Sequence, residues 1–101
     1  MRQLDDRVAV VTGAGSGIGR ATAVALARRG CVVALADVDV DGLADTQRAV
    51  EPHTKATVHV ADVADADRMA RLADEVVAHH GACHILVNNA GVLDVACQTW
   101  T

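Results

Sequence analysis

The sequence predicts an α/β fold in which a parallel β-sheet is covered by helices on both faces. Four apolar runs of strand length alternate with three segments of helical periodicity in the 101 residues. The connections between them are short, so right-handed crossovers are expected, most simply with the strands in the order 3-2-1-4. No linker, repeat or low-complexity tract interrupts the pattern. Residues 1–101 are therefore expected to belong to a single domain.

The first strand is expected at residues 7–12, where a continuous run of Val and Ala is typical of a strand buried on both faces. A helix is expected at 16–29, with the small residues Ala21 and Ala25 on one side. Gly30 follows two arginines and is placed to end this helix as its C-cap.

The second strand is expected at 31–36 and stops at Asp37. A polar helix follows at 40–50 and is ended by Pro52, because proline cannot continue a helix. Asp39 and Asp41 are expected to be solvated helix-capping residues.

The third strand is expected at 56–61 and stops at Asp62. Asp65 is expected to cap the next helix, and Gly81 to end it. The apolar positions of this helix recur at helical spacing, at Met69, Leu72, Ala73, Val76 and Val77. A fourth strand is expected at 83–87. Because parallel strands end at one edge of a sheet, the polar and glycine residues that follow the four strands are expected to lie together.

The composition favours a small ligand over a macromolecular one. The net charge is -4 and no basic run is longer than two residues, so neither nucleic acid nor an anionic membrane is expected as a partner. Three dispersed cysteines without a CxxC pair indicate neither a disulfide framework nor a zinc site, and Cys31 and Cys83 are expected in the core. No segment has the length of a membrane span, and a cytoplasmic location is expected.

A glycine-rich turn, TGAGSGIG at residues 12–19, lies between the first strand and the first helix. Glycines permit a tight turn and a close approach of the backbone to a pyrophosphate, and the helix N-terminus adds free amides and a positive dipole. Gly13, Gly17 and Gly19 fit the spacing GxxxGxG, since Ile18 stands where GxGxxG has glycine. A merely flexible loop is the less favoured interpretation.

Asp37 ends the second strand beside this turn. A carboxylate at that position accepts hydrogen bonds from both hydroxyls of an adenosine ribose and repels a 2′-phosphate. An NADP site would favour a basic side chain there or in the turn, whereas the sequence has Asp37, Val38 and Ser16. NAD is therefore the expected cofactor. The alternative is an ordinary strand-end or capping aspartate.

Polar residues also follow the third and fourth strands. Asp62 and Val63 offer an acceptor and a backbone amide to the edge of an adenine, although a capping role for Asp62 is equally expected. Asn88 and Asn89 carry amides that tie strand ends together and contact the cofactor ribose. Plain turn formation before Gly91 is the alternative.

In this order and spacing, the glycine turn, Asp37, the Asp-Val pair and the NNAG segment at 88–91 resemble the short-chain dehydrogenase/reductase family, classical type, over essentially the whole chain. The resemblance implies a Rossmann-type fold and an NAD-dependent oxidoreductase that transfers hydride between the nicotinamide and an alcohol or ketone. It also implies a structural role for Asn88. The implied cofactor-binding residues are Gly13, Ser16, Gly17, Ile18, Gly19, Asp37, Asp62, Val63, Asn89, Ala90 and Gly91.

In that family a tyrosine acts as general acid/base, a lysine four residues later lowers its pKa, and a serine orients the substrate. The sequence has no tyrosine, its one lysine is Lys55, and Ser16 belongs to the glycine turn. We therefore expect the N-terminal, cofactor-binding part of an enzyme, inactive as it stands. The outer edge of the fourth strand is expected to be open, and the interface of the usual homo-oligomer to lie outside the sequence.

Two other function classes are open: a non-catalytic NAD-binding module and, less favoured, a methyltransferase with an adenosine ligand. His53 and His59 have no partner in sequence and are expected to be exposed. The weakest hypothesis is a metal site, because the helix end and the strand that carry its ligands are expected to point them in different directions. The members of that cluster are His79, His80, Cys83 and His84.

Overall fold

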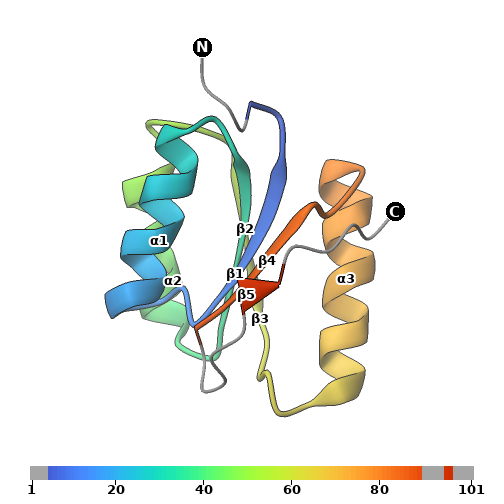
Figure 1. The fold of residues 1–101 in the computed structure, drawn as a ribbon. Coiled ribbons are helices and arrows are strands. Elements are labelled where there is room, and N and C mark those ends of the chain that lie inside the picture. Colours follow the sequence, from blue (N-terminus) through green and yellow to red (C-terminus); the bar gives the residue numbers. More distant parts are fainter. Residues whose placement is uncertain (1–4, 90–94, 97–101) are drawn as a thin grey trace.

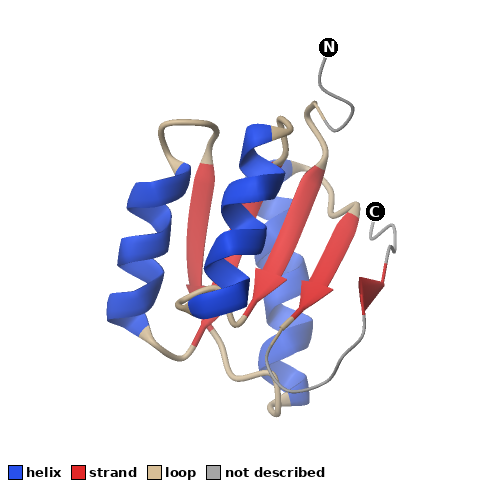
Figure 2. Cartoon of the chain, turned by 60° about the vertical axis from the view of Figure 1, so that its left-hand side comes forward, coloured by secondary structure: helices blue, strands red, loops and turns tan. Residues whose placement is uncertain are grey.

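The computed structural model describes residues 5–89 and 95–96. The elements are, in chain order, β1 (Val8–Thr12), α1 (Gly17–Arg28), β2 (Val32–Asp37), α2 (Val40–Val50), β3 (Ala56–Val60), α3 (Ala66–His80), β4 (Ile85–Asn88) and β5 (Val95–Ala96). The first four strands are parallel and lie in the order β3-β2-β1-β4. In Figure 1, α1 and α2 cover one face of the sheet and α3 the other, as Figure 2 also shows. The predicted Rossmann-type arrangement is confirmed.

The outer edge of β4 differs from the expectation. The two-residue strand β5 pairs with β4 in antiparallel register, Leu86 with Ala96 and Val87 with Val95. An antiparallel neighbour needs only a short connection, whereas a parallel neighbour needs a crossover of a dozen or more residues. The edge that was expected to be open is therefore paired over two residues, by a strand too short to give a periodicity signal.

Side-chain and glycine caps set the ends of the helices. The carboxylates of Asp39 and Asp65 each accept a hydrogen bond at 3.0 Å from a backbone N–H in the first turn of α2 and α3, respectively. Gly30 and Gly81 follow α1 and α3 with φ of 95° and 85°, the left-handed conformation that glycine adopts without steric cost. The predicted capping roles of these four residues are confirmed.

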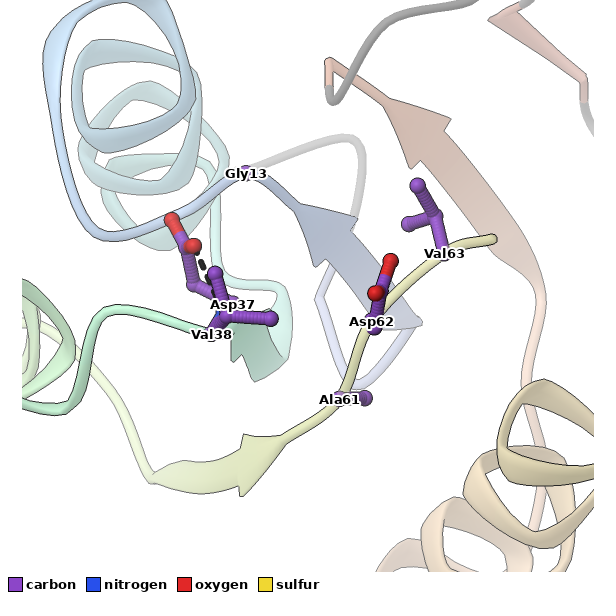
Figure 3. A pocket seen from close by; sticks show the side chains of 6 residues that line it. All are labelled: Gly13, Asp37, Val38, Ala61, Asp62 and Val63. Atoms are coloured by element: carbon purple, nitrogen blue, oxygen red, sulfur yellow. Dashed lines mark hydrogen bonds between the residues drawn. The ribbon is translucent and has the colours of Figure 1, made fainter. Parts of the chain in front are cut away.

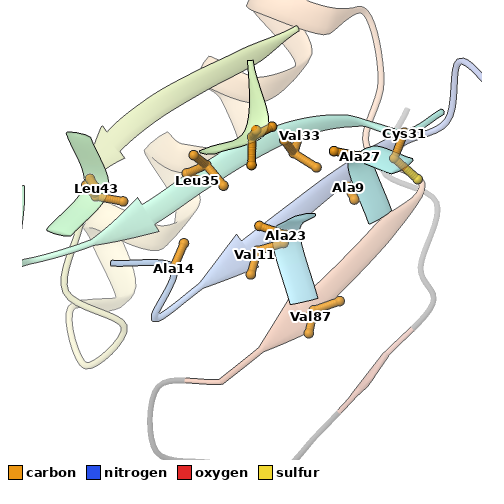
Figure 4. Packing of buried hydrophobic residues seen from close by; sticks show 11 residues of the cluster. Ala9, Val11, Ala14, Ala23, Ala27, Cys31, Val33, Leu35, Leu43 and Val87 are labelled. Carbon is orange, nitrogen blue, oxygen red and sulfur yellow. The ribbon is translucent and has the colours of Figure 1, made fainter. Parts of the chain in front are cut away.

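Two apolar layers hold the helices on the sheet. On one face, side chains of β1 and β2 such as Val11 and Leu35 pack against α1 and α2 (Figure 4). The residues of α1 that are buried there are Gly19, Ala23 and Ala27. Ala21 and Ala25, the small residues noted in the sequence, lie on the exposed side of α1. The buried small residues let α1 approach the sheet closely.

On the other face, Leu72 and Val76 of α3 are buried against Val10 of β1 and the alanines of β2. Cys31 and Cys83 are fully buried, one in each layer, as expected. Burial raises the pKa of both thiols, so each behaves as a small apolar residue rather than a nucleophile. Among the helices that the structure describes, none is both long enough and apolar enough to cross a membrane.

His59 contradicts the sequence expectation of an exposed side chain. It is 5% exposed on β3, with Nδ1 2.9 Å from Oε1 of Glu75 and Nε2 2.8 Å from Oγ1 of Thr57. The same threonine hydroxyl lies 2.9 Å from Nε2 of His80. The partner Glu75 is on α3, which the crossover brings over β3. No pattern local to β3 indicates that contact, whereas His53 is exposed as expected.

Three of the four side chains of the hypothetical metal site, those of His80, Cys83 and His84, have separate hydrogen-bond partners. His80 belongs to the cluster around His59, and the Sγ of Cys83 donates to the carbonyl of Ile85. Nδ1 of His84 accepts a hydrogen bond from the amide of Val8. Within residues 5–89, no group of three His, Cys, Asp or Glu side chains is arranged to hold a metal ion.

Candidate cofactor site

The carboxyl ends of β1, β2 and β3 surround a cavity of about 190 Å³. Figure 3 shows the six residues that line it, which are Gly13, Asp37, Val38, Ala61, Asp62 and Val63. Four of them were predicted as site residues. Val38 and Ala61 were missed, although each directly adjoins a predicted strand-end aspartate. Sites that enclose a whole drug-sized ligand have at least about 300 Å³, so this cavity suits one end of an extended ligand.

The glycine turn borders this cavity and needs glycine for two different reasons. Gly13 and Gly17 have φ of 63° and 53°, which side chains other than glycine adopt only with strain. Gly19 instead allows close packing, because a Cβ there would lie 1.9 Å from the carbonyl oxygen of Gly13. A Cβ at Gly17 would have no atom within 4 Å. The backbone at Gly17 therefore faces open space.

The N-terminus of α1 is left without a side-chain cap. Ser16 is the N-cap residue, with φ -162°, but its hydroxyl makes no capping hydrogen bond. The first N–H groups of a helix have no intrahelical acceptor and carry the positive end of its dipole. Ser16, Gly17 and Ile18 are exposed, Ile18 by 75%. This end of α1 can bind an anion through its backbone amides.

Asp37 lies between the glycine turn and the cavity. Its Oδ2 accepts a hydrogen bond from the amide of Gly15 at 2.8 Å, and its Oδ1 accepts from Val38 and Asp39 at 2.7 and 3.1 Å. A Cβ on residue 15 would lie only 2.8 Å from Oδ2, so Gly15 permits this approach. Three amides thus fix the orientation of the carboxylate, and its remaining lone pairs are available to hydroxyl donors.

Behind the turn, two residues that sequence reasoning missed hold its carbonyl groups. The guanidinium of Arg20 donates to the carbonyl of Gly15, and the buried hydroxyl of Thr46 donates to that of Ala14. In the sequence, each of these two residues has a feature that could have indicated its role. Arg20 is a cation in the first turn of a helix, against the dipole, and Thr46 is a polar residue on the buried side of α2, between Leu43 and Val50.

Asp62 does not cap a helix, because the N-cap residue of α3 is Asp65; its side chain instead holds the turn that leads to this helix. Its Oδ1 accepts a hydrogen bond from the amide of Ala64 at 2.9 Å, while the residue also lines the cavity. The hydroxyl of Thr12 donates to Oδ1 of Asn88 at 2.8 Å. This contact joins β1 to β4 and confirms the structural role of Asn88.

Asn89, the residue directly after β4, has an unused donor. The side-chain nitrogen of Asn89 is buried and has no hydrogen-bond partner within the described part of the chain. A buried polar group without a partner costs free energy, so this nitrogen is a candidate ligand contact. Two further predicted site residues, Ala90 and Gly91, lie outside the described residues.

The parallel sheet, its strand order and the glycine turn between β1 and α1 define the class as Rossmann-type α/β proteins. Within that class, the family model of the short chain dehydrogenases matches residues 7–100. The chain belongs to the short chain dehydrogenase family.

A curated relative, cis-4-hydroxycyclohexanecarboxylate dehydrogenase of Sinomonas cyclohexanicum, is 46% identical over 90 residues, which are 88% of this chain and 36% of the relative. The chain spans 34% and 36% of the length of two curated relatives it matches and 15% of a third. NAD+-bound xylitol dehydrogenase matches with a TM-score of 0.86 at 35% identity, over 89% of this chain and 35% of that structure. A metagenomic short-chain oxidoreductase in complex with NADP matches with a TM-score of 0.81 at 44% identity, over 88% of this chain and 41% of that structure. Relatives in this fold thus bind either cofactor.

Proposed function

We propose that this chain supplies the adenosine and pyrophosphate half of the cofactor site in an NAD-dependent oxidoreductase that acts on an alcohol or ketone. The observation that carries the proposal is the carboxylate of Asp37, which three amides fix at the cavity beside an uncapped helix N-terminus. A carboxylate so placed suits the two hydroxyls of a ribose, and the free amides suit a pyrophosphate.

The residues present fit such a ligand. Gly17 leaves open space where a side chain would otherwise stand, the exposed amides of the first turn of α1 are donors, and the side-chain nitrogen of Asn89 is a buried donor in need of an acceptor. Val38 and Val63 give the cavity apolar walls for an adenine ring. Gly13 and the residues at 16–19 would hold the pyrophosphate, and Asp37 the ribose.

The charges around the cavity favour NAD over NADP. Two of the six lining residues, Asp37 and Asp62, are acids, and none of the six is basic. A 2′-phosphate would bring one and a half to two further negative charges, by analogy with other phosphate monoesters, next to a carboxylate that already accepts three hydrogen bonds. An NADP site instead needs a cation at this position to bind the 2′-phosphate, either an arginine, through two parallel hydrogen bonds, or a lysine.

A bound nicotinamide would supply the hydride donor or acceptor, and this chain would bind and orient its adenosine end. The family resemblance assigns proton transfer to a tyrosine, and the sequence has none. We therefore expect the chain by itself to bind cofactor without turning over an alcohol. A cytoplasmic location, a homo-oligomeric complete enzyme, and the absence of nucleic-acid and membrane partners belong to the same proposal.

Calorimetric titration of the purified protein with NAD and NADP tests the proposal. The expected result is that NAD binds at least about tenfold more tightly, equivalent to about 1.4 kcal/mol. Asp37→Asn keeps the side-chain size but loses the negative charge. It should therefore weaken NAD binding and reduce the ratio of NAD affinity to NADP affinity. Asp41→Asn, an exposed acid in the first turn of α2 outside the cavity, is the matched control. Equal binding of NADP, or binding of neither, would contradict the proposal.

A further inference from the structure

Arg20 occupies a position where a cation is electrostatically disfavoured. It lies in the first turn of α1, beside the positive end of the helix dipole, and this turn has no acidic residue. Directed contacts offset this cost. Its Nε donates to Oγ1 of Thr46 at 2.9 Å, and its Nη2 lies 2.7 Å from the carbonyl oxygen of Gly15 and 3.4 Å from that of Gly42. The guanidinium thus joins the glycine turn to the first turn of α2.

Thr46 completes this connection from a buried position. Its side chain is fully buried, and its hydroxyl donates to the carbonyl of Ala14 at 2.6 Å while accepting from Arg20. A hydroxyl has one donor and two acceptor positions, so both contacts can form at once. Two consecutive carbonyl groups of the turn, those of Ala14 and Gly15, therefore face α2, where Thr46 holds the first and the side chain of Arg20, reaching across from α1, holds the second.

Peptide planarity transmits these contacts to the amides on the other side of the turn. In a trans peptide the C=O of one residue and the N–H of the next point in opposite directions. The carbonyl of Ala14 is held by Thr46, and the following amide, that of Gly15, reaches Asp37 at 2.8 Å. By the same rule, Arg20 holds the carbonyl of Gly15, so the amide of Ser16 is directed away from α2.

We infer that Arg20 and Thr46 are positioning residues, which hold two peptide groups of the glycine turn so that one amide fixes Asp37 and the next points outward to bind the pyrophosphate of the cofactor. This inference rests on the proposed function. Neither side chain lines the cavity, so both act through the backbone of the turn. Gly42 allows the close approach, since a Cβ there would lie 2.3 Å from the carbonyl oxygen of Gly15.

The test compares three ligands that share an adenosine: NAD and ADP, which carry a pyrophosphate, and adenosine, which does not. Arg20→Gln and Thr46→Val should each weaken NAD and ADP binding about tenfold, the scale of one lost charge-assisted hydrogen bond. Adenosine binding should fall by a smaller factor than ADP binding, because Asp37 keeps its contacts with Val38 and Asp39 when the amide of Gly15 is released. Arg28→Gln, an exposed arginine in the last turn of α1, is the control.

Conservative variants distinguish a positioning role, which depends on directed hydrogen bonds, from an effect of the arginine charge alone. Thr46→Ser keeps the hydroxyl and should bind ADP like the wild type. Arg20→Lys keeps the charge but loses the planar fork, so it should bind ADP as weakly as Arg20→Gln; wild-type affinity in Arg20→Lys would overturn the inference. Circular dichroism checks that each variant folds. If Arg20→Gln does not fold, the ligand affinities of Thr46→Val test the inference alone, because this substitution keeps the side-chain volume.

The outcomes distinguish this inference from the function on which it rests. A wild-type protein that binds neither NAD nor ADP contradicts the proposed function itself. A wild-type protein that binds both, together with Arg20 and Thr46 variants of unchanged affinity, overturns only the positioning role. An equal loss of affinity for all three ligands also overturns it, because a merely structural role would weaken adenosine as much as ADP.

Discussion

The glycines of the turn are required for different structural reasons, although they occupy equivalent positions in the sequence motif. Gly17 has a positive φ and open space around it, while Gly19 lies inside α1 with the carbonyl of Gly13 directly against its Cα. The first position is restricted by backbone conformation and the second by packing. Replacement by alanine should therefore have different energetic costs at the two positions.

Gly19→Ala should destabilise the fold more than Gly17→Ala. At Gly19 the gain in helix propensity, about 1 kcal/mol, is outweighed by overpacking against backbone, which at a Cβ-to-oxygen distance of 1.9 Å should exceed the usual upper value of about 3 kcal/mol, because the carbonyl of Gly13 cannot rotate away like a side chain. At Gly17 the cost is that of a left-handed residue, about 1–2 kcal/mol. Urea unfolding midpoints of the two variants and the wild type test this order, and an equal or reversed order would contradict it.

How much of the site was predictable depends on where the partners of each residue lie. Asp37 and Asp62 were found because each ends a strand, and the fold class alone brings strand ends together at one edge. Arg20 and Thr46 were missed because they meet across 26 residues, in a contact that depends on the packing of α1 against α2. The turn contact of Asp62 with Ala64 is not decided by the sequence, because the same carboxylate suits a helix cap, a turn and a ligand.

Among the elements, α3 is attached to the edge strand β3 by a polar cluster, whereas its apolar face packs against β1 and β2. Arg68 donates from its two terminal nitrogens to the carboxylate of Glu75 at 2.8 and 3.2 Å and from Nε to the carbonyl of Val60 at 2.9 Å. Glu75 in turn contacts His59.

The cluster shifts two pKa values in the same direction. Burial lowers the pKa of His80 from 6.5, assisted by the positive charges of Lys55, His79 and His59. For Glu75, burial alone would raise the pKa, but the hydrogen bonds from His59 and Arg68 and their positive charges outweigh it and hold the pKa below 4.5. In both cases the folded state binds protons less readily than the unfolded state, so stability is greatest above the unfolded pKa and decreases on acidification.

We therefore expect the urea unfolding midpoint to decrease in two steps as the pH falls. The first step begins as the pH drops through 6.5, the unfolded value for His80, and the second as it drops through 4.5, that for Glu75. His80→Gln should remove the His80 part of the first step, whereas His53→Gln, which alters an exposed histidine, should leave it. An unchanged pH profile in His80→Gln would exclude the role of His80.

Prediction of the elements from the sequence was accurate where their ends carry local signals and incomplete where pairing is decided at a distance. Asp39, Asp65 and Gly30 mark helix ends through hydrogen bonds within a few residues. The buried side of α1 was not identifiable in the same way, because alanines occur all around this helix, and the sheet buries Ala23 rather than Ala21. The strand β5 is defined only by its partner β4.

At the scale of the whole molecule, burial of the four parallel strands is greatest at β1 and β2 and least at β3. All five residues of β1 are buried, with strands on both sides and helices over both faces. The strand β3 pairs on one side only, with β2, and Val58 and Val60 are 41% and 52% exposed. The glycine turn leaves the central strand β1, whereas Asp62 follows the edge strand β3.

Native-state hydrogen exchange should reflect this gradient. Amides exchange by local opening in elements with few buried contacts and by global unfolding in the centre of the core. We expect the amides of β1 and β2 to be the slowest and those of β3 to exchange faster, since opening β3 breaks one strand pairing and the α3 cluster but leaves β1 paired with β2 and β4. Glu75→Gln, which weakens that cluster, should speed exchange in β3 without changing β1. Equal protection of β1 and β3 would contradict this expectation and would mean that the sheet opens as one unit. The loss of stability on acidification that we expect from His80 and Glu75 would then affect the glycine turn as well as β3.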